Sequence, residues 1–206
     1  AEGAKVMLVD LREADLKKAM EALDGKNAAS FAADVTRADQ TRAYIDATVK
    51  KFGKIDVLFS NAGNSGVVAP IEDFPEDVFD SVMAVHIRGA FLACKYGLSQ
   101  MNDGGSIVIT SSVVGLMGDG GGSVAYVTAK HAQVGLMRCL AKELAPRRIR
   151  VNTIHPGPID NAFQRDVEAG LSQAIGRDGG AFFDELIPLG RHATAEEVAR
   201  SVLYLV

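Results

Sequence analysis

Residues 105–112 read GSIVITSS and lead into residues 123–145, which have the pattern of a helix. The centre of the first stretch, Ile107-Val108-Ile109, is continuously apolar, as is typical of a strand covered by helices on both faces of a parallel sheet. Its two serines come where the strand ends, and open parallel sheets present functional groups at that edge. The stretch therefore predicts one strand-helix unit of a parallel α/β fold.

The same unit recurs along the chain. Strands are expected at residues 5–10, 28–34, 55–60, 106–111 and 149–155, and helices at 11–23, 37–52, 75–101 and 123–145. This alternation implies right-handed crossovers, and so a doubly wound parallel sheet in three α/β/α layers. Since neither a linker nor an internal repeat is visible, we expect a single domain over residues 1–206.

Residues 156–191 follow a different pattern, because glycine and proline interrupt short apolar pieces. Long loops after a strand of an open α/β sheet are commonly binding loops. We expect an irregular substrate lid over about residues 158–188, with Phe163, Phe182 and Phe183 forming an apolar pocket. The alternative is a mobile surface excursion with incidental aromatic residues.

Composition excludes several classes of protein. The chain has 206 residues, 48% of them hydrophobic, and a formal net charge of −4, so it has no cationic surplus for nucleic acid or an anionic membrane. Cys94 and Cys139 are isolated, which suits a reducing compartment, and we expect a cytoplasmic protein with no membrane segment. The four histidines lack metal-binding spacing, so we expect no metal site. No G-x-S-x-G nucleophile elbow is present, which disfavours a hydrolase.

Tyr126 and Lys130 lie at positions i and i+4 of an expected helix and therefore share one face. Free tyrosine has a pKa of about 10, and acid/base work near neutrality requires a value roughly 3 units lower. An ammonium group about 4 Å away can supply a shift of that size. We therefore expect Ser112, Tyr126 and Lys130 to converge on one reactive point.

Seven motifs occur in order along the chain, namely Asp10, Asp34-Val35, Asn61-Ala62-Gly63, Ser112, the pair Tyr126 and Lys130, Pro156-Gly157, and residues 188–191. Together they resemble the short-chain dehydrogenase/reductase family, of the 3-oxoacyl-carrier-protein reductase-like type. The resemblance implies a Rossmann-type fold and an NAD-dependent oxidoreductase that transfers hydride between nicotinamide and a secondary alcohol or ketone. It also implies a homo-oligomer, a tetramer or dimer.

The resemblance also implies residue roles. Tyr126 becomes the general acid/base, Ser112 binds the substrate oxygen, and Lys130 holds the nicotinamide ribose and lowers the tyrosine pKa. Asp10 accepts hydrogen bonds from the adenosine ribose and repels a 2′-phosphate, which favours NAD over NADP, although Arg12 could accommodate a phosphate. The implied cofactor-binding set is Asp10, Leu11, Asp34, Val35, Asn61, Ala62, Gly63, Tyr126, Lys130, Pro156, Gly157 and Ile159.

Three positions depart from the family pattern. His86 stands where the family has its fourth catalytic residue, an asparagine in a locally distorted helix, and two interpretations stay open: a proton relay through its carbonyl or a titrating imidazole, or simple helix packing. The spacing from Ser112 to Tyr126 is one residue longer than usual, which the glycine run at 118–122 can absorb. Asn161 replaces a threonine.

Two further expectations follow from the resemblance. The family's first strand with its glycine-rich turn, and its last strand, have no counterpart in the sequence, so we expect an incomplete copy of a longer protein. Because the first strand is central in the family's sheet, the strands ending at Asp10 and Ser60 would lack a partner between them. The substitution at His86 leaves a second functional hypothesis, a noncatalytic dinucleotide-binding or scaffolding protein on the same fold.

Overall fold

The computed structural model describes residues 2–23, 25–118 and 122–206. All of the strand pairs in this part of the chain are parallel. One sheet has the order β1-β2 and the other β3-β4-β5. The strands are β1 (Val6–Asp10), β2 (Ala28–Ala32), β3 (Ile55–Ser60), β4 (Met101–Thr110) and β5 (Arg150–Ile154).

Strand β4 begins at Met101, five residues before the start expected from the sequence. Ile55 lies opposite Met101, whereas Val57 lies opposite Ser106, so the register of β3 and β4 shifts between these pairs. The shift lets the polar and glycine-rich residues 102–105 join the strand although they break its apolar pattern.

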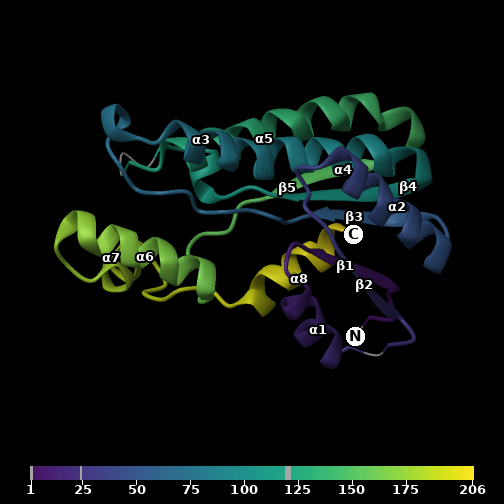
Figure 1. Ribbon diagram of the computed structural model, residues 1–206, viewed down its shortest axis with the longest axis horizontal. Helices are drawn as coiled ribbons and strands as arrows, with labels where there is room; N and C mark the ends of the chain where they lie inside the picture. Colours follow the sequence, from purple (N-terminus) through teal and green to yellow (C-terminus); the bar gives the residue numbers. More distant parts are fainter. Residues whose placement is uncertain (1, 24, 119–121) are drawn as a thin grey trace.

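Helices cover both faces of the sheet β3-β4-β5 (Figure 1), which confirms the predicted Rossmann-type α/β fold. Helices α2, α4 and α5 lie on one face, α8 packs against β4 and β5 from the other, and α1 packs on β1 and β2. The helices are α1 (Glu13–Glu21), α2 (Ala38–Phe52), α3 (Glu76–Met83), α4 (Gly89–Gly97), α5 (Val124–Glu143), α6 (Ala162–Ile175), α7 (Gly179–Leu186) and α8 (Ala195–Leu205).

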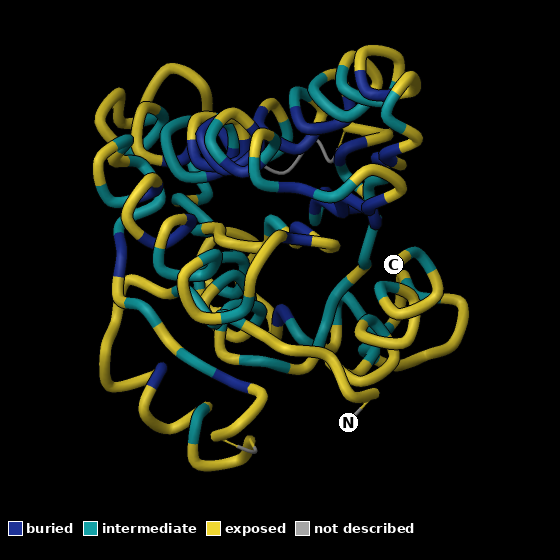
Figure 2. Tube along the Cα trace, turned by 90° about the vertical axis from the view of Figure 1, so that its right-hand side faces the viewer, coloured by how far each residue is buried: buried dark blue, intermediate teal, exposed yellow. Residues whose placement is uncertain are grey.

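The core lies between the sheet β3-β4-β5 and the helices above it. Figure 2 shows the deeply buried stretches gathered in this region, whereas the chain elsewhere is largely exposed. Ile107, Val108 and Ile109 of β4 are fully buried, as the continuous apolar run predicts. Thr110 and the residues after it are therefore anchored by a strand that cannot move without disrupting the core.

The helix expected over residues 75–101 is interrupted. Helix α3 ends at Met83, Ala84–Arg88 form a π-helical turn, and α4 then begins at Gly89. The N–H of Gly89 donates to the carbonyl oxygen of Ala84, five residues back. Single π-helical turns of this kind frequently occur at functional sites, and this one contains His86.

The expectation of an irregular lid over residues 158–188 is wrong in its secondary structure, because α6 and α7 occupy most of it. Asn161 and Asp178 accept hydrogen bonds from the backbone N–H groups of Gln164 and Ala181, and so cap the two helices. Gly176, with φ of 67°, ends α6 in the left-handed region. These residues interrupt the apolar pattern because they start and end helices.

Strands β1 and β3 belong to different sheets, and no strand lies between them among the described residues. The expected central strand is compatible with this arrangement and stays a prediction. Within the same described ranges, no helix is long and apolar enough to cross a membrane.

Candidate active site

Ser112 lies where β4 ends, at the carboxyl edge of the sheet. The N–H groups of Ser111 and Val113 donate to the carbonyl oxygens of Ile154 (2.9 Å) and Pro156 (3.1 Å). These bonds continue the pairing of β4 with β5 beyond the strand ends. Because its two neighbours are bonded in this way, the backbone of Ser112 is held at a fixed point of the edge. The Ser112 hydroxyl lies 3.4 Å from the carbonyl oxygen of Pro156.

Tyr126, in the first turn of α5, is brought against Ser112. A hydrogen bond with the Ser112 side chain lowers the pKa of Tyr126, but burial has the larger effect and raises it above its usual value. The Tyr126 ring also lies 6.0 Å, between centroids, from the ring of Phe163 on α6. The phenol thus sits between the strand edge and the lid.

Lys130 is 3% exposed and lies one turn further along α5. Its Nζ donates to the carbonyl oxygen of Thr110 at 2.7 Å and lies 5.2 Å from the centroid of the Tyr126 ring. Burial lowers the pKa of Lys130 to about 7. The expected net lowering of the tyrosine pKa is not found here, because burial of the phenol outweighs the hydrogen bond that lowers it.

His86 lies on the other side of Tyr126, with the two rings edge-on and 5.5 Å apart. It is 1% exposed, and its Nε2 lies 2.8 Å from the carbonyl oxygen and 3.1 Å from the N–H of Asn64. Burial, followed by the nearby charge of Lys130, lowers the pKa of His86 to about 4. A pKa of about 4 leaves the imidazole uncharged at pH 7 and does not favour titration near neutrality.

Two residues of this cluster escaped the sequence reasoning. Gln133 is 1% exposed, and its Nε2 donates to the backbone carbonyl of His86 at 3.2 Å. Asn64 contacts Nε2 of the His86 imidazole through its backbone N–H and carbonyl groups. Gln133 lies seven positions after Tyr126, a spacing that places both on one helix face, and that spacing was the available signal. For Asn64 the residue type carries no signal, because its backbone makes the contact.

The implied cofactor residues lie along the carboxyl edges of the two sheets. Asp10 ends β1, Asp34 follows β2, Asn61 follows β3 and Pro156 follows β5. The Asp10 carboxylate is exposed and accepts the backbone N–H of Arg12 at 2.9 Å. Asn61 accepts from the hydroxyl of Thr110 at 2.8 Å, so this residue is tied to the strand that carries Ser112.

Glycine at position 63 is required by close packing. A Cβ at Gly63 would lie 2.5 Å from Cε1 of His86. At Gly157 a Cβ would meet nothing within 4 Å, leaving open space beside the backbone. The carboxyl edge of the strands thus has an exposed carboxylate after β1, small residues after β3 and open space after β5. These features fit a dinucleotide lying along that edge. Leu11 and Ala62 lie on the same edge.

Two of the implied cofactor residues make other contacts. Ile159 pairs with Ala193 in an isolated bridge at the base of the lid. Val35 packs against the π-turn end of α4, because a Cβ at Gly89 would lie 3.0 Å from its Cγ2. The expected absorption of the extra residue by the glycine run at 118–122 falls on residues 119–121, which lie outside the described residues.

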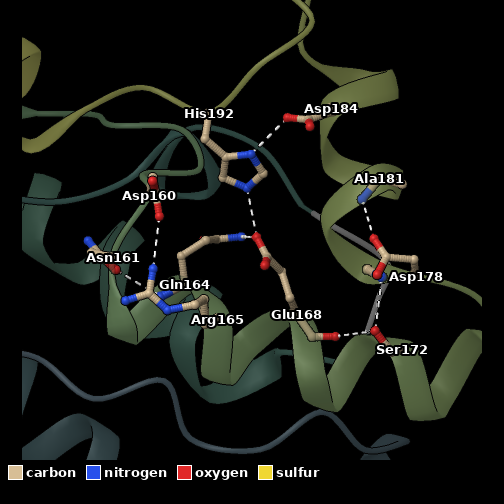
Figure 3. A network of polar contacts seen from close by, with 11 residues as sticks. Asp160, Asn161, Gln164, Arg165, Glu168, Ser172, Asp178, Ala181, Asp184 and His192 are labelled. Carbon is tan, nitrogen blue, oxygen red and sulfur yellow. Dashed lines mark hydrogen bonds and ion pairs between the residues drawn. The ribbon is translucent and has the colours of Figure 1, made fainter.

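The lid is held together by a polar network (Figure 3). His192 lies between two carboxylates, with Nε2 2.7 Å from Glu168 of α6 and Nδ1 2.8 Å from Asp184 of α7. Ser172 accepts the N–H of Gly179 and donates to the carbonyl oxygen of Glu168. In the part of the chain that the structure describes, no group of three His, Cys, Asp or Glu residues could hold a metal ion.

Comparison with known proteins agrees with this geometry. The family model described as enoyl-(acyl carrier protein) reductase matches residues 1–206. Levodione reductase of Leifsonia aquatica is 36% identical over 212 residues, covering 100% of this chain and 79% of that protein. (+)-Borneol dehydrogenase 2 of Salvia officinalis is 36% identical over 210 residues, covering 98% and 74%.

Solved structures give the same result. The crystal structure of levodione reductase superposes with a TM-score of 0.91, covering 99% of this chain and 81% of that one, at 36% identity. A 3-ketoacyl-(acyl-carrier-protein) reductase from Brucella melitensis, complexed with NADH, has a TM-score of 0.88 at 25% identity, with 98% and 80% covered. The chain therefore belongs to the short-chain dehydrogenase/reductase family, whose members bind a nicotinamide dinucleotide, and is an oxidoreductase acting on CH–OH donors.

Proposed function

We propose that the protein is an NAD-dependent oxidoreductase that interconverts an apolar secondary alcohol and its ketone. The convergence of Ser112, Tyr126 and Lys130 at the end of β4 carries this proposal. The hydroxyl group lies at the end of the strand, and the phenol and the ammonium group lie one turn apart on the helix. Together these groups can hold a carbonyl oxygen and exchange a proton with it.

Each of the three side chains has a distinct role. Ser112 donates a hydrogen bond to the substrate oxygen, where negative charge develops during reduction. Tyr126 gives its proton to that oxygen in reduction and removes it in oxidation. Lys130 is placed to stabilise the tyrosinate that this transfer leaves, and to hold the ribose of the cofactor. When bound, the nicotinamide supplies or accepts the hydride.

The structure around Asp10 supports NAD rather than NADP. Its carboxylate is exposed at the end of β1, where a 2′-phosphate on the adenosine ribose would bring a second negative charge. Arg12, the residue that could offset this repulsion, pairs with Asp15 at 2.6 Å. The preference is tested by titrating the protein with NADH and with NADPH.

The apolar character of the substrate rests on Phe163. Of the three lid phenylalanines, only this one is described in ring contact with Tyr126. Phe182 and Phe183 pack edge-on against each other at 5.8 Å, and Arg177 lies over the Phe182 ring. Substituents of a ketone held at Tyr126 therefore meet an aromatic surface, which favours carbon chains or rings over charged groups.

A screen of secondary alcohols and ketones with NAD(H) and NADP(H) tests the activity. We expect turnover of apolar members with NAD(H); a protein that binds NADH but turns over none of the panel would favour the noncatalytic alternative. The presence of His86 where the family has asparagine motivates that alternative. His86→Asn separates the two, because a silent wild type that gains activity would identify His86 as the cause.

Assembly and location stay predictions. We propose a homo-oligomer, a tetramer or dimer, through α4 and α5, and Phe91 of α4 is exposed as such an interface requires. The proposed cytoplasmic location rests on the two unpaired cysteines, Cys94 and Cys139. Size-exclusion chromatography with light scattering measures the assembly.

A further inference from the structure

One face of α5 carries three polar residues that all approach His86. Tyr126, Lys130 and Gln133 stand at positions i, i+4 and i+7, which form a single stripe along a helix. The Tyr126 ring meets the imidazole edge-on, the charge of Lys130 acts on it, and the Gln133 amide bonds the His86 carbonyl. This face of α5 thus contacts both the side chain and the backbone of His86.

The last of these contacts is made to a carbonyl within the π-helical turn Ala84–Arg88. In this turn the N–H of Gly89 reaches back five residues to Ala84, instead of four. The carbonyl of His86 accepts the Gln133 Nε2 at 3.2 Å, across the interface between the two helical segments. Since a carbonyl oxygen only accepts, the nitrogen of the Gln133 amide must face it. The orientation of this side chain therefore follows from its partner.

Stability alone does not account for a glutamine here. Gln133 Oε1 and His86 Nδ1 are buried and have no hydrogen-bond partner among the described residues. A buried polar atom without a partner costs free energy, and an apolar pair of similar shape avoids that cost. Leucine at position 133 would satisfy the packing of a core helix. What leucine could not do is bond the carbonyl of the π-helical turn.

We propose that Gln133 is a positioning residue for the reaction: its amide holds the carbonyl of His86 and so fixes the imidazole against the edge of the Tyr126 ring. The imidazole is held from its other end by the backbone of Asn64, next to the loop at Gly63. Gln133 thereby sets the distance between the proton-transferring phenol and the segment that follows β3.

This inference rests on the proposed role of Tyr126, and the tests keep the two apart. Gln133→Leu keeps the volume and removes the amide. We expect kcat to fall about ten- to a hundredfold, because small displacements of aligned groups cost this much, while the substrate KM changes little. Ser106→Ala is the matched control: it removes another buried side-chain bond to a carbonyl, from Ser106 Oγ to Leu205 at 2.8 Å, away from Tyr126.

Gln133→Glu gives a second readout that packing alone would not move. A protonated carboxyl group can donate to the His86 carbonyl, whereas the ionised group cannot. The titratable groups facing position 133 are His86 on the π-helical turn and Lys130 and Tyr126 on its own helix. We expect the ratio of kcat for this variant to that of the wild type to be near one at low pH and to fall as the pH rises.

The outcomes are distinct. A folded Gln133→Leu variant whose kcat stays within twofold of the wild type would overturn the positioning role, and so would a ratio for Gln133→Glu that is constant with pH. If Gln133→Leu does not fold, the pH dependence of Gln133→Glu decides. A wild type without turnover would instead overturn the proposed function, and the positioning role with it.

Discussion

Gly63→Ala tests the packing that joins the segment after β3 to His86. The added Cβ would lie 2.5 Å from Cε1 of the imidazole, closer than real Cβ atoms approach other atoms. The ring cannot move away freely, because it is buried, rests against Tyr126 and contacts Asn64. Overpacking of this kind costs about 1–3 kcal/mol, and each kcal/mol lowers Tm by about 2–4 °C in a chain of this size.

The assay is a double-mutant cycle read by thermal unfolding. In a His86→Ala background the added methyl group meets no ring, so the cost of Gly63→Ala should largely disappear, giving a coupling of about 1–3 kcal/mol. Gly157→Ala serves as the stability control, because a Cβ there meets nothing within 4 Å. An equal loss of Tm from Gly63→Ala in both backgrounds would refute the packing assigned to His86.

Three further predictions follow. Burial lowers the pKa of Lys130 to about 7, so the ammonium form is present below that pH and lost above it, and kcat for ketone reduction should fall as the pH rises through about 7. The side chain in Lys130→Arg is always charged, so this variant should not show the fall in kcat. An identical fall in Lys130→Arg would contradict the assignment. Asp10→Ser should improve NADPH binding relative to NADH by about fivefold or more, since unit charges about 4 Å apart in water repel by about 1 kcal/mol; fluorescence titration measures it, and an unchanged ratio would remove the NAD argument. His192→Ala should loosen the lid by breaking its contacts to Glu168 and Asp184, raising the substrate KM more than it lowers kcat; steady-state kinetics with an unchanged KM would show that the network does not order the lid.

The repeating strand-helix pattern predicted the fold because each unit is encoded locally. The apolar run at Ile107-Val108-Ile109 reports burial on both faces, and the structure confirms it. Helices α6 and α7 were not predicted in the same way, because glycines such as Gly176 and Gly179 read as breaks, although Gly176 ends α6 and Gly179 begins α7. The helix caps at Asn161 and Asp178 are local signals that the irregular apolar pattern obscured.

The candidate site was predictable only in part. Ser112, Tyr126 and Lys130 follow from spacing, and the structure places them together. The pKa values do not follow from spacing, because desolvation acts on each group separately and opposes the pairing expected for Tyr126 and Lys130. The residues of the π-helical turn at His86 fit an ordinary helix, so only the family resemblance implied a local distortion there. The contact of Gln133 with a carbonyl of that turn was not predicted.

The most direct test of the proposed chemistry is the turnover of Tyr126→Phe, measured beside its affinity for NADH. Removing the phenol oxygen takes away the proton donor and leaves the ring, so kcat should fall about 10²- to 10⁴-fold, while the Kd for NADH stays within about twofold. A Tyr126→Phe variant that retains wild-type kcat on the same ketone would contradict the assignment of Tyr126 as the acid/base.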